Sequence, residues 1–439
     1  MGYLTLPVYN PLIVAVCLSH CPLLVMPTAH YRLPLQPALL LCSALLLGVL
    51  AGCGSSRNAQ PTETAADSSA TVQGSAFTLL FVTESGNLVT HNTQSGSTTP
   101  LVRGVQSVGS QALSPDRSRL AVSYMTDDST HLALVDRAGP TIQRVHGVAG
   151  AATYSLAWHP TDDRLAVAYY TPASDGTRGP GDVLTVRPRS APQRVGCQAA
   201  REVLHWFADG TLATRDDENV YIVAENGCAT QASFDARRIH EATYSASGER
   251  LAYIYRELNY DRDAGAYRPD SALTLSAPDG QGSEVLFGDE RAARHLRWAP
   301  EADELAFSAR LEDTPRRQIM IYNAVQDRIL FLIPPSQAAP GDQTHPRWSP
   351  SGNFIAFTQH ASETATAVVR VEGQTRQLGS TVGPVAGWID DQTLVVRNDS
   401  RLRVVDLSGN ERYARPAPKA FLHGWAAPQP AAAPAGANR

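Results

Sequence analysis

One short pattern recurs along most of the chain: an aromatic residue or leucine, two or three polar residues or proline, a turn, then Leu-Ala or a close relative. Its copies lie about 37 to 54 residues apart, a spacing typical of propeller blades. All six tryptophans occupy the first position of the pattern, which scattered tryptophans would not do by chance. That position is filled in order by Leu113, Trp158, Trp206, Tyr244, Trp298, Trp348, Trp388 and Trp425.

Each unit has the composition of four short antiparallel strands. A short apolar strand precedes the turn, the turn itself is polar, as in a hairpin, and a strand rich in β-formers follows it. One such sheet cannot bury both of its faces, but stacking against the next unit does so. We therefore expect an all-β propeller over residues 77–428. The count of inner strands favours eight blades, and seven is the alternative if one unit is degenerate.

Ring closure is also predicted from the two ends of the repeat region. Residues 77–103 supply only the later strands of a blade, whereas Phe421–Trp425 supplies an inner strand with nothing after it. The C-terminal strand is therefore expected to pair with the strand near Thr78 and complete the first blade.

The repeat resembles TolB-type and WD40-like propeller repeats, in which a Trp-Ser-Pro-Asp-Gly turn precedes a Leu-Ala-Phe strand. Trp348-Ser349-Pro350-Ser351-Gly352 is the best copy in this chain. The resemblance covers about 350 residues and implies the fold rather than a role, because propellers host many activities. We expect no counterpart of the additional N-terminal α/β domain of TolB.

The N-terminal segment is typical of an export signal. Ala38–Leu50 is an apolar run of about 13 residues, preceded by Arg32 and ended by Leu50-Ala51-Gly52-Cys53. This ending resembles the lipobox of bacterial lipoproteins, which implies that Cys53 is lipidated and becomes the mature N-terminus. We expect a signal peptide over 1–53, with Met26 as an alternative start. The remaining expected segments are a flexible tether over 54–76 and a disordered tail over 429–439.

Charge and cysteine content narrow the classes of partner. The net charge of -5 provides no basic field, so we expect no nucleic-acid partner. Of the six cysteines, only Cys53, Cys197 and Cys228 remain after processing at the lipobox. Cys197 and Cys228 are a candidate disulfide in an oxidising compartment. Their expected strand positions differ by about six residues, roughly 20 Å, which argues against the bond.

A group of histidines and arginines repeats at the start of the inner strands. His295 and His345 lie three residues before a blade tryptophan, whereas His240 lies four before Tyr244 and is one residue out of register. Arg297 and Arg347 directly precede the tryptophans. Neutral imidazoles suit a divalent metal and arginines suit an anion, so these five residues are the candidate ligand site. The simpler interpretation is repeat inheritance of solvated channel residues.

The expected function is binding. Four connections between second and third strands, at 125–130, 170–181, 256–269 and 311–316, should share one face, and long loops often carry function. No Gly-x-Ser-x-Gly, His-Glu-x-x-His or Walker A motif is present, and we expect no counterpart of the hydrolase domain of prolyl oligopeptidases. We expect a monomeric, lipid-anchored envelope scaffold without a cofactor, whose loop-rich face binds a protein, glycan or small ligand. The alternative is a metal-dependent envelope enzyme, similar to oligogalacturonate lyases, acting on an acidic polysaccharide.

Overall fold

The structure is a computed structural model that describes residues 76–426, apart from short internal gaps. The expected signal peptide and Cys53, all but the last residue of the tether, the C-terminal tail, and both Cys197 and Cys228 lie outside the described residues. Within the described part, no helix is long and apolar enough to cross a membrane. The gaps are residues 138, 140, 174–177, 196–199, 225–229, 262–265, 289–292, 312–313, 335–337, 339, 372–374 and 378–382.

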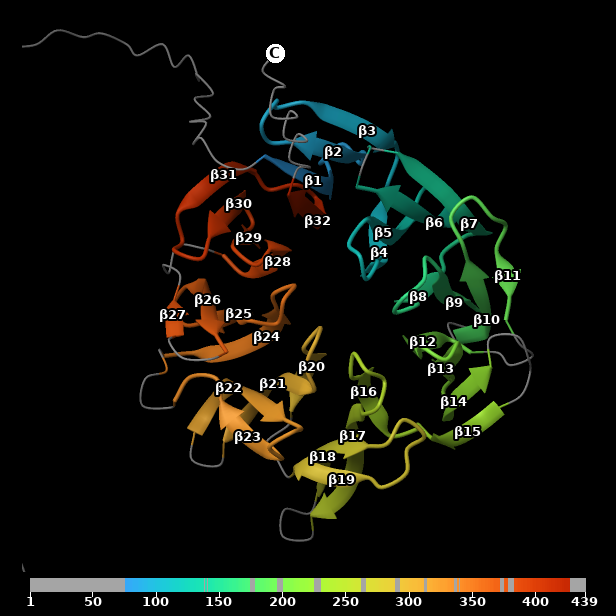
Figure 1. The fold of residues 1–439 in the computed structure, drawn as a ribbon, viewed down its shortest axis with the longest axis vertical. Coiled ribbons are helices and arrows are strands. Elements are labelled where there is room, and N and C mark those ends of the chain that lie inside the picture. Colours follow the sequence, from blue (N-terminus) through green and yellow to red (C-terminus); the bar gives the residue numbers. More distant parts are fainter. Residues whose placement is uncertain are drawn as a thin grey trace, which may run out of the picture. The chain divides into compact units, whose positions relative to one another are not determined.

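The described chain forms a ring of eight four-stranded antiparallel sheets, which confirms the eight-bladed propeller (Figure 1). Each blade runs outward from the ring axis in sequence order, except blade 1, whose innermost strand comes from the C-terminus. From the axis outward, blade 1 consists of β32 (Ala420–Ala426), β1 (Phe77–Val82), β2 (Leu88–Asn92) and β3 (Thr98–Val102), and blade 2 of β4 (Ser107–Leu113), β5 (Arg119–Met125), β6 (Ser129–Asp136) and β7 (Ile142–Ala149).

Blades 3 to 5 follow the same order. Blade 3 consists of β8 (Thr153–Trp158), β9 (Leu165–Pro172), β10 (Arg178–Val186) and β11 (Gln193–Arg194). Blade 4 consists of β12 (Glu202–Trp206), β13 (Thr211–Arg215), β14 (Asn219–Ala224) and β15 (Thr230–Asp235). Blade 5 consists of β16 (Ile239–Tyr244), β17 (Leu251–Asp261), β18 (Ala266–Ser276) and β19 (Glu284–Phe287).

Blades 6 to 8 complete the ring. Blade 6 consists of β20 (Arg294–Trp298), β21 (Glu304–Leu311), β22 (Thr314–Asn323) and β23 (Arg328–Phe331). Blade 7 consists of β24 (Asp342–Trp348), β25 (Phe354–His360), β26 (Thr364–Arg370) and β27 (Thr375–Gln377). Blade 8 consists of β28 (Val385–Asp390), β29 (Thr393–Arg397), β30 (Arg401–Asp406) and β31 (Glu411–Pro416).

The repeated aromatic residue lies at or near the end of every inner strand that carries it, as the sequence pattern predicts. Trp158, for example, pairs with Leu165 of the Leu-Ala strand that follows its turn. The indole reaches the preceding blade: Nε1 of Trp158 donates to the carbonyl oxygen of Ala112 at 2.9 Å. Trp298, Trp348 and Trp388 make the same bond to Thr243, Arg297 and Arg347. These bonds fix the spacing of adjacent inner strands.

Ring closure is confirmed. Strand β32 pairs antiparallel with β1, with Thr78 opposite Trp425. Each blade interface holds its own apolar cluster, including the interface between blade 8 and blade 1, where Leu79 and Phe81 pack with Val395 and Val404. Because every sheet buries both faces against its neighbours, the units stabilise one another only as a closed ring.

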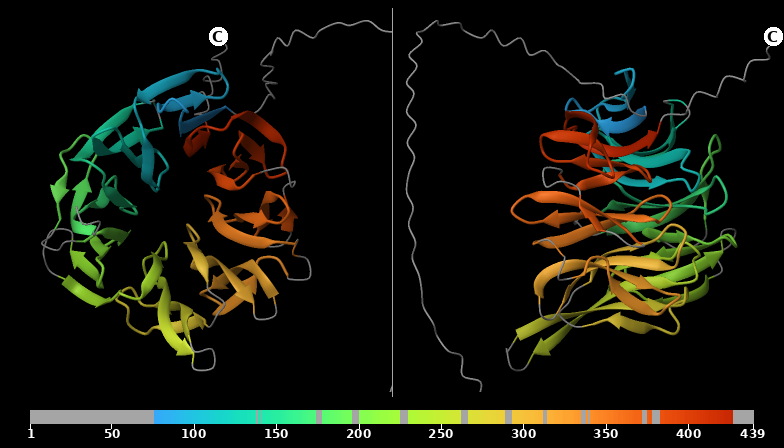
Figure 2. Two further views of the ribbon diagram at one scale, coloured as in Figure 1. Left: turned by 180° about the vertical axis from the view of Figure 1, so that it is seen from behind. Right: turned by 60° about the vertical axis from the view of Figure 1, so that its left-hand side comes forward.

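Two of the four expected loops are largely hairpin instead. Strands β17 and β18 pair without interruption as far as Asp261 and Ala266, so most of 256–269 extends the blade. Strands β9 and β10 likewise continue to Pro172 and Arg178. Paired backbone satisfies its own hydrogen-bonding groups, which an irregular loop of that length would leave to water. The side view in Figure 2 shows the strand connections gathered on two opposite faces of the ring. These hairpins share the face on which the inner strands begin, here called the hairpin face.

Candidate functional site

The candidate site is a His–Arg cluster formed by Arg294, His295 and Arg297 of β20 with His345 and Arg347 of β24. Both strands are the innermost of their blades (Figure 1). Arg294 begins β20 on the hairpin face, whereas Arg297 and Arg347 lie next to the far ends of their strands, so the cluster extends along the ring axis. The three arginines and His345 are exposed, and His295 is half-buried. The cluster therefore combines solvent access with a backbone that the blade sheets hold in place.

The structure brings two of the three candidate histidines together. The ring centroids of His295 and His345 lie 3.9 Å apart, and their planes are inclined by 33°. Both residues have positive φ, 58° for His295 and 54° for His345. Each lies at a register shift between the first and second strands of its blade. Strained backbone at non-glycine residues is common where side chains are aimed for function, and here the strain turns both imidazoles toward each other.

The repeat explains what is different about these two histidines. In blades 2, 3 and 5, the side chain three residues before the repeated aromatic or leucine position hydrogen-bonds to the inner strand of the next blade. Ser155 Oγ donates to the carbonyl oxygen of Val203 at 3.0 Å, and Oε2 of Glu241 accepts from the His295 amide at 3.0 Å. Glu241 Oε1 also accepts from the Leu296 amide at 2.9 Å. His295 and His345 occupy the same repeat position. Between blades 6 and 7, the contact of their two rings takes the place of the hydrogen bond, which leaves ring nitrogens available.

Hydroxyl groups fix one nitrogen of each imidazole. Nδ1 of His295 lies 3.1 Å from Ser308 Oγ, whose hydroxyl donates to the carbonyl oxygen of Arg294 at 3.3 Å. Nδ1 of His345 lies 2.9 Å from Thr344 Oγ1. Burial and the neighbouring His345 and arginine cations lower the pKa of His295 to about 4, and burial with Arg347 lowers that of His345. Both imidazoles are therefore neutral at pH 7.

Positive charge dominates around the stacked pair. Arg297 lies 3.6 Å from Glu241 Oε1, whereas the side chains of Arg294 and Arg347 have no hydrogen-bond or ion-pair partner among the described residues. The Arg347 side chain is exposed to solvent but packs against protein on several sides. The resulting partial burial and the nearby Arg297 cation lower its pKa. A guanidinium remains charged at neutral pH, so these side chains present planar donors to an anion.

His240 does not join the pair. It is exposed on β16, at a register shift between Ile239 and Glu241, and no contact connects it to either stacked imidazole in the described part of the chain. His240 lies four residues before the aromatic position rather than three, and this shift by one residue predicted that its side chain would face the other side of the strand. Among the described residues, no group of three or more His, Cys, Asp or Glu side chains could hold a metal ion. The guanidinium groups around the imidazole pair suit an anion.

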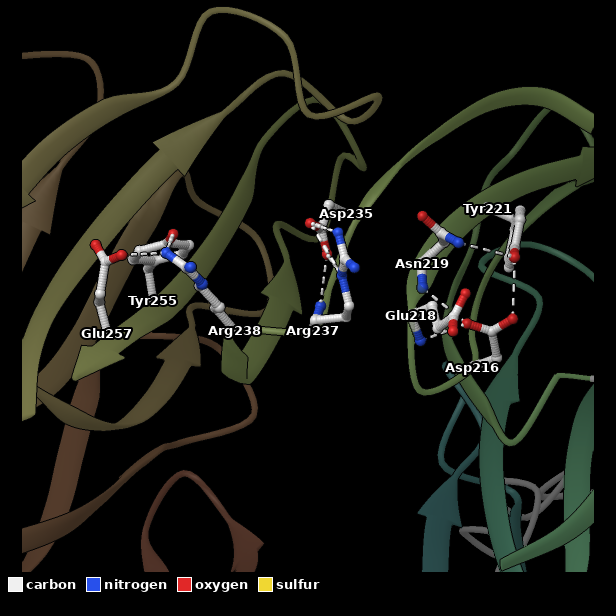
Figure 3. Close-up of polar contacts among 9 residues, drawn as sticks. All are labelled: Asp216, Glu218, Asn219, Tyr221, Asp235, Arg237, Arg238, Tyr255 and Glu257. Atoms are coloured by element: carbon white, nitrogen blue, oxygen red, sulfur yellow. Dashed lines mark hydrogen bonds and ion pairs between the residues drawn. The ribbon is translucent and has the colours of Figure 1, made fainter.

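A second group of polar contacts lies on the hairpin face, between blades 4 and 5 (Figure 3). Arg238 donates to the Tyr255 hydroxyl at 2.9 Å and forms an ion pair with Glu257, so it braces the base of the β17–β18 hairpin. Arg237 pairs with Asp235 and lowers the pKa of that carboxyl to about 2. These charges are paired with one another, so this group supports the hairpin rather than presenting free charge.

Sequence reasoning missed Glu241, Arg294 and Ser308 as parts of the site. Glu241 could have been found, because alignment of the repeats places it at the same position as Ser110, Ser155, His295 and His345. Ser308 could not, because it lies on the second strand of blade 6 and reaches His295 only through the cross-strand register.

Comparisons with known proteins agree on the fold. No protein-family model matches the sequence, and no curated protein matches it. Among solved structures, the chain is similar to AztD from Citrobacter koseri, with 10% identity over 80% of this chain and 98% of that chain and a TM-score of 0.51. Dihydro-heme d1 dehydrogenase NirN matches at 13% identity over 80% of this chain and 75% of that chain, with a TM-score of 0.52.

TolB from Acinetobacter baumannii is also similar, at 13% identity over 81% of this chain and 67% of that chain, with a TM-score of 0.37. At these identities the comparisons show the propeller fold alone. Together with the eight blades, the likeness to AztD and NirN confirms the propeller fold expected from the repeat.

Proposed function

We propose that this protein is a lipid-anchored scaffold of the bacterial envelope that binds a partner on its hairpin face. The observation that carries the proposal is the coincidence of two features on that face. The extended hairpins project there, and Arg294 of the His–Arg cluster, the first residue of β20, lies at the same end of the inner strands, directly before the strained and paired His295. Side chains on a rigid propeller rim, next to unpaired guanidinium groups, suit a partner that carries negative charge.

The anchor is proposed on the lipobox alone. Lipidation of Cys53 would hold the propeller at a membrane surface through residues 54–76, which as a random coil span roughly 26 Å. Radiolabelled palmitate should enter the parent protein and be lost in Cys53→Ser. Label that persists in Cys53→Ser would remove the anchor from the proposal.

The binding face can be tested by photo-crosslinking in intact envelopes. A photoreactive amino acid is placed at Glu363, exposed on the hairpin face between β25 and β26, or at Gln392, exposed in the turn between β28 and β29 on the opposite face. We expect defined crosslinked products from position 363 and none from position 392. Equal crosslinking from both positions, or none from position 363, would contradict the proposed face.

A further inference from the structure

The His–Arg cluster leaves cationic groups without a counter-charge, and this observation deepens the proposed function. Glu241 is committed to the amides of His295 and Leu296, and Asp342 accepts from the Arg317 amide at 2.9 Å. The side chains of Arg294 and Arg347 have no polar partner in the described part of the chain. Guanidinium groups therefore outnumber free carboxylates, and the local charge is matched by a small anion with more than one negative charge.

The charged and titratable groups facing the imidazole pair come from five strands, and most are cationic. Those acting on His295 are Arg294, Arg297, Arg317 and His345; those acting on His345 are Arg347, His360 and Arg297, opposed by the Glu241 carboxylate. Asp342 lies at the start of β24, and His240 precedes Glu241 on β16. An anion placed among these groups meets donors from both blade 6 and blade 7.

The hydrogen-bond chain at His295 determines which ring nitrogen carries the proton. Ser308 has a single hydroxyl hydrogen, and we assign it to the carbonyl oxygen of Arg294, which lies 3.3 Å from Ser308 Oγ and can only accept. Ser308 Oγ must then accept from Nδ1–H of His295, which lies 3.1 Å away. The neutral ring consequently has a bare Nε2, which accepts a hydrogen bond and cannot donate one. Nε2 of His295 has no partner among the described residues.

We propose that the His–Arg cluster binds hydrogenphosphate, an oxyanion that offers charged oxygens to the guanidinium groups and one proton to the bare imidazole nitrogen. Arg294, Arg297 and Arg347 hold the oxygens, because planar guanidinium donors match tetrahedral oxyanions well. The P–OH group donates to Nε2 of His295. Two backbone contacts position the arginines: the carbonyl oxygens of Arg297 and Arg347 accept the indole N–H of Trp348 and Trp388.

The proton on the ligand gives the site a selectivity that charge alone would not. Sulfate has the same shape and charge but no proton near neutral pH, so its oxygens face the lone pair of Nε2 without a hydrogen bond. A phosphate monoester dianion also lacks the proton above its second pKa of about 6. Free phosphate is thus distinguished both from sulfate and from a phosphorylated surface or headgroup.

Isothermal titration of the full chain in detergent, at low salt and about pH 7.5, compares inorganic phosphate, sulfate and methyl phosphate. We expect phosphate to bind at least about tenfold more tightly than either other anion, as for one lost hydrogen bond in a site that leaves a polar atom unpaired. Arg347→Gln should weaken phosphate binding by about tenfold or more. His295→Phe should reduce the preference over sulfate, because the accepting nitrogen is removed.

Arg194→Gln is the matched control, since Arg194 is an exposed arginine on the outer strand of blade 3. It should bind phosphate as the parent does, and thermal melts should show that all variants are folded. The inference is overturned if phosphate does not bind, if sulfate binds equally well, or if Arg347→Gln binds unchanged. Such a failure is separable from the proposed function, because crosslinking from the hairpin face would persist without phosphate binding.

Discussion

The histidines of this propeller lie in different surroundings, and burial and nearby charges set the pKa of each. Burial, together with the Arg117 and Arg137 cations, lowers the pKa of His423 on β32 to about 3. Nε2 of His423 is buried and has no hydrogen-bond partner. Burial alone lowers the pKa of His205 on β12 to about 4, where its ring lies 4.9 Å from Phe207 and 5.4 Å from Tyr244. Both imidazoles are therefore neutral in the folded protein at any pH near neutrality.

These histidines predict a loss of stability in mild acid. Below about pH 6.5 the unfolded chain binds protons at His423 and His205, whereas the folded chain takes none until the pH nears 4 or 3. The free energy of unfolding should fall as the pH drops through this window, by up to about 1.4 kcal/mol per pH unit for each histidine. Urea unfolding of the parent and His423→Gln measures it. The variant should show the shallower slope, and equal slopes would contradict the assignment.

The candidate site could be predicted from sequence only in part. His295, His345, Arg297 and Arg347 were found because the repeat places them at the same distance from the blade tryptophan. Stacking of the two imidazoles depends on positive φ at both residues, and nothing in a histidine side chain indicates that backbone conformation. The exclusion of His240 follows from alternation along the strand, which the sequence did indicate.

At the scale of the blade, an indole hydrogen bond links adjacent inner strands in several blades but not in all of them. Nε1 of Trp158 donates to the carbonyl oxygen of Ala112, whereas Nε1 of Trp206 is buried and has no hydrogen-bond partner among the described residues. Both side chains are buried. The two tryptophans thus form a matched pair that separates the hydrogen bond from the burial of the ring.

We expect Trp158→Phe to destabilise the protein more than Trp206→Phe does. The first change removes a hydrogen bond to the Ala112 carbonyl oxygen; the second removes an N–H that makes no hydrogen bond among the described residues. The difference in unfolding free energy should be about 1 kcal/mol. Chemical denaturation of both variants measures it. Because Trp206 is the more buried ring, an equal or larger loss in Trp206→Phe would show that ring burial outweighs the bond.

The β17–β18 hairpin shows where sequence reasoning failed at this scale. A connection was expected over 256–269, but the strands pair through it to Asp261 and Ala266. Composition reports local preference, whereas cross-strand pairing and the contacts of Arg238 with Tyr255 and Glu257 are tertiary.

Arg238→Ala should therefore loosen the hairpin base. Hydrogen exchange of the β17 and β18 amides should become faster, while the other blades keep their protection. Arg237→Ala is the control, because Arg237 pairs with Asp235 and has no polar contact with β17 in the described part of the chain. If both variants exchanged alike, Arg238 would not be the brace.

At the scale of the whole ring, the eight-blade count and its closure could be predicted because they follow from a strand missing at one end of the repeat region and present at the other. The closing contact is β32 on β1, with the cluster between blades 8 and 1 behind it. Two arginines of blade 2 donate hydrogen bonds to backbone carbonyl oxygens at this seam. Arg117 donates to the carbonyl oxygen of Ile389 at 3.1 Å, and Arg137 donates to that of Ala426 at 3.0 Å.

When Arg117 or Arg137 is replaced, we expect the ring to open first at the seam between β32 and β1. Only non-covalent pairing holds β32 to β1. Losing the hydrogen bond from Arg117 or Arg137 should therefore weaken ring closure without disturbing the hairpins within any blade. Arg137→Gln should lower the unfolding free energy by about 1–2 kcal/mol and speed exchange of the Leu422 and Gly424 amides ahead of other inner strands. Arg401→Gln, an exposed arginine 3.9 Å from Glu411 in blade 8, should change neither. Exchange that rose equally in all eight inner strands of Arg137→Gln would mean that the ring opens as a whole and that the seam is no weaker than any other blade interface.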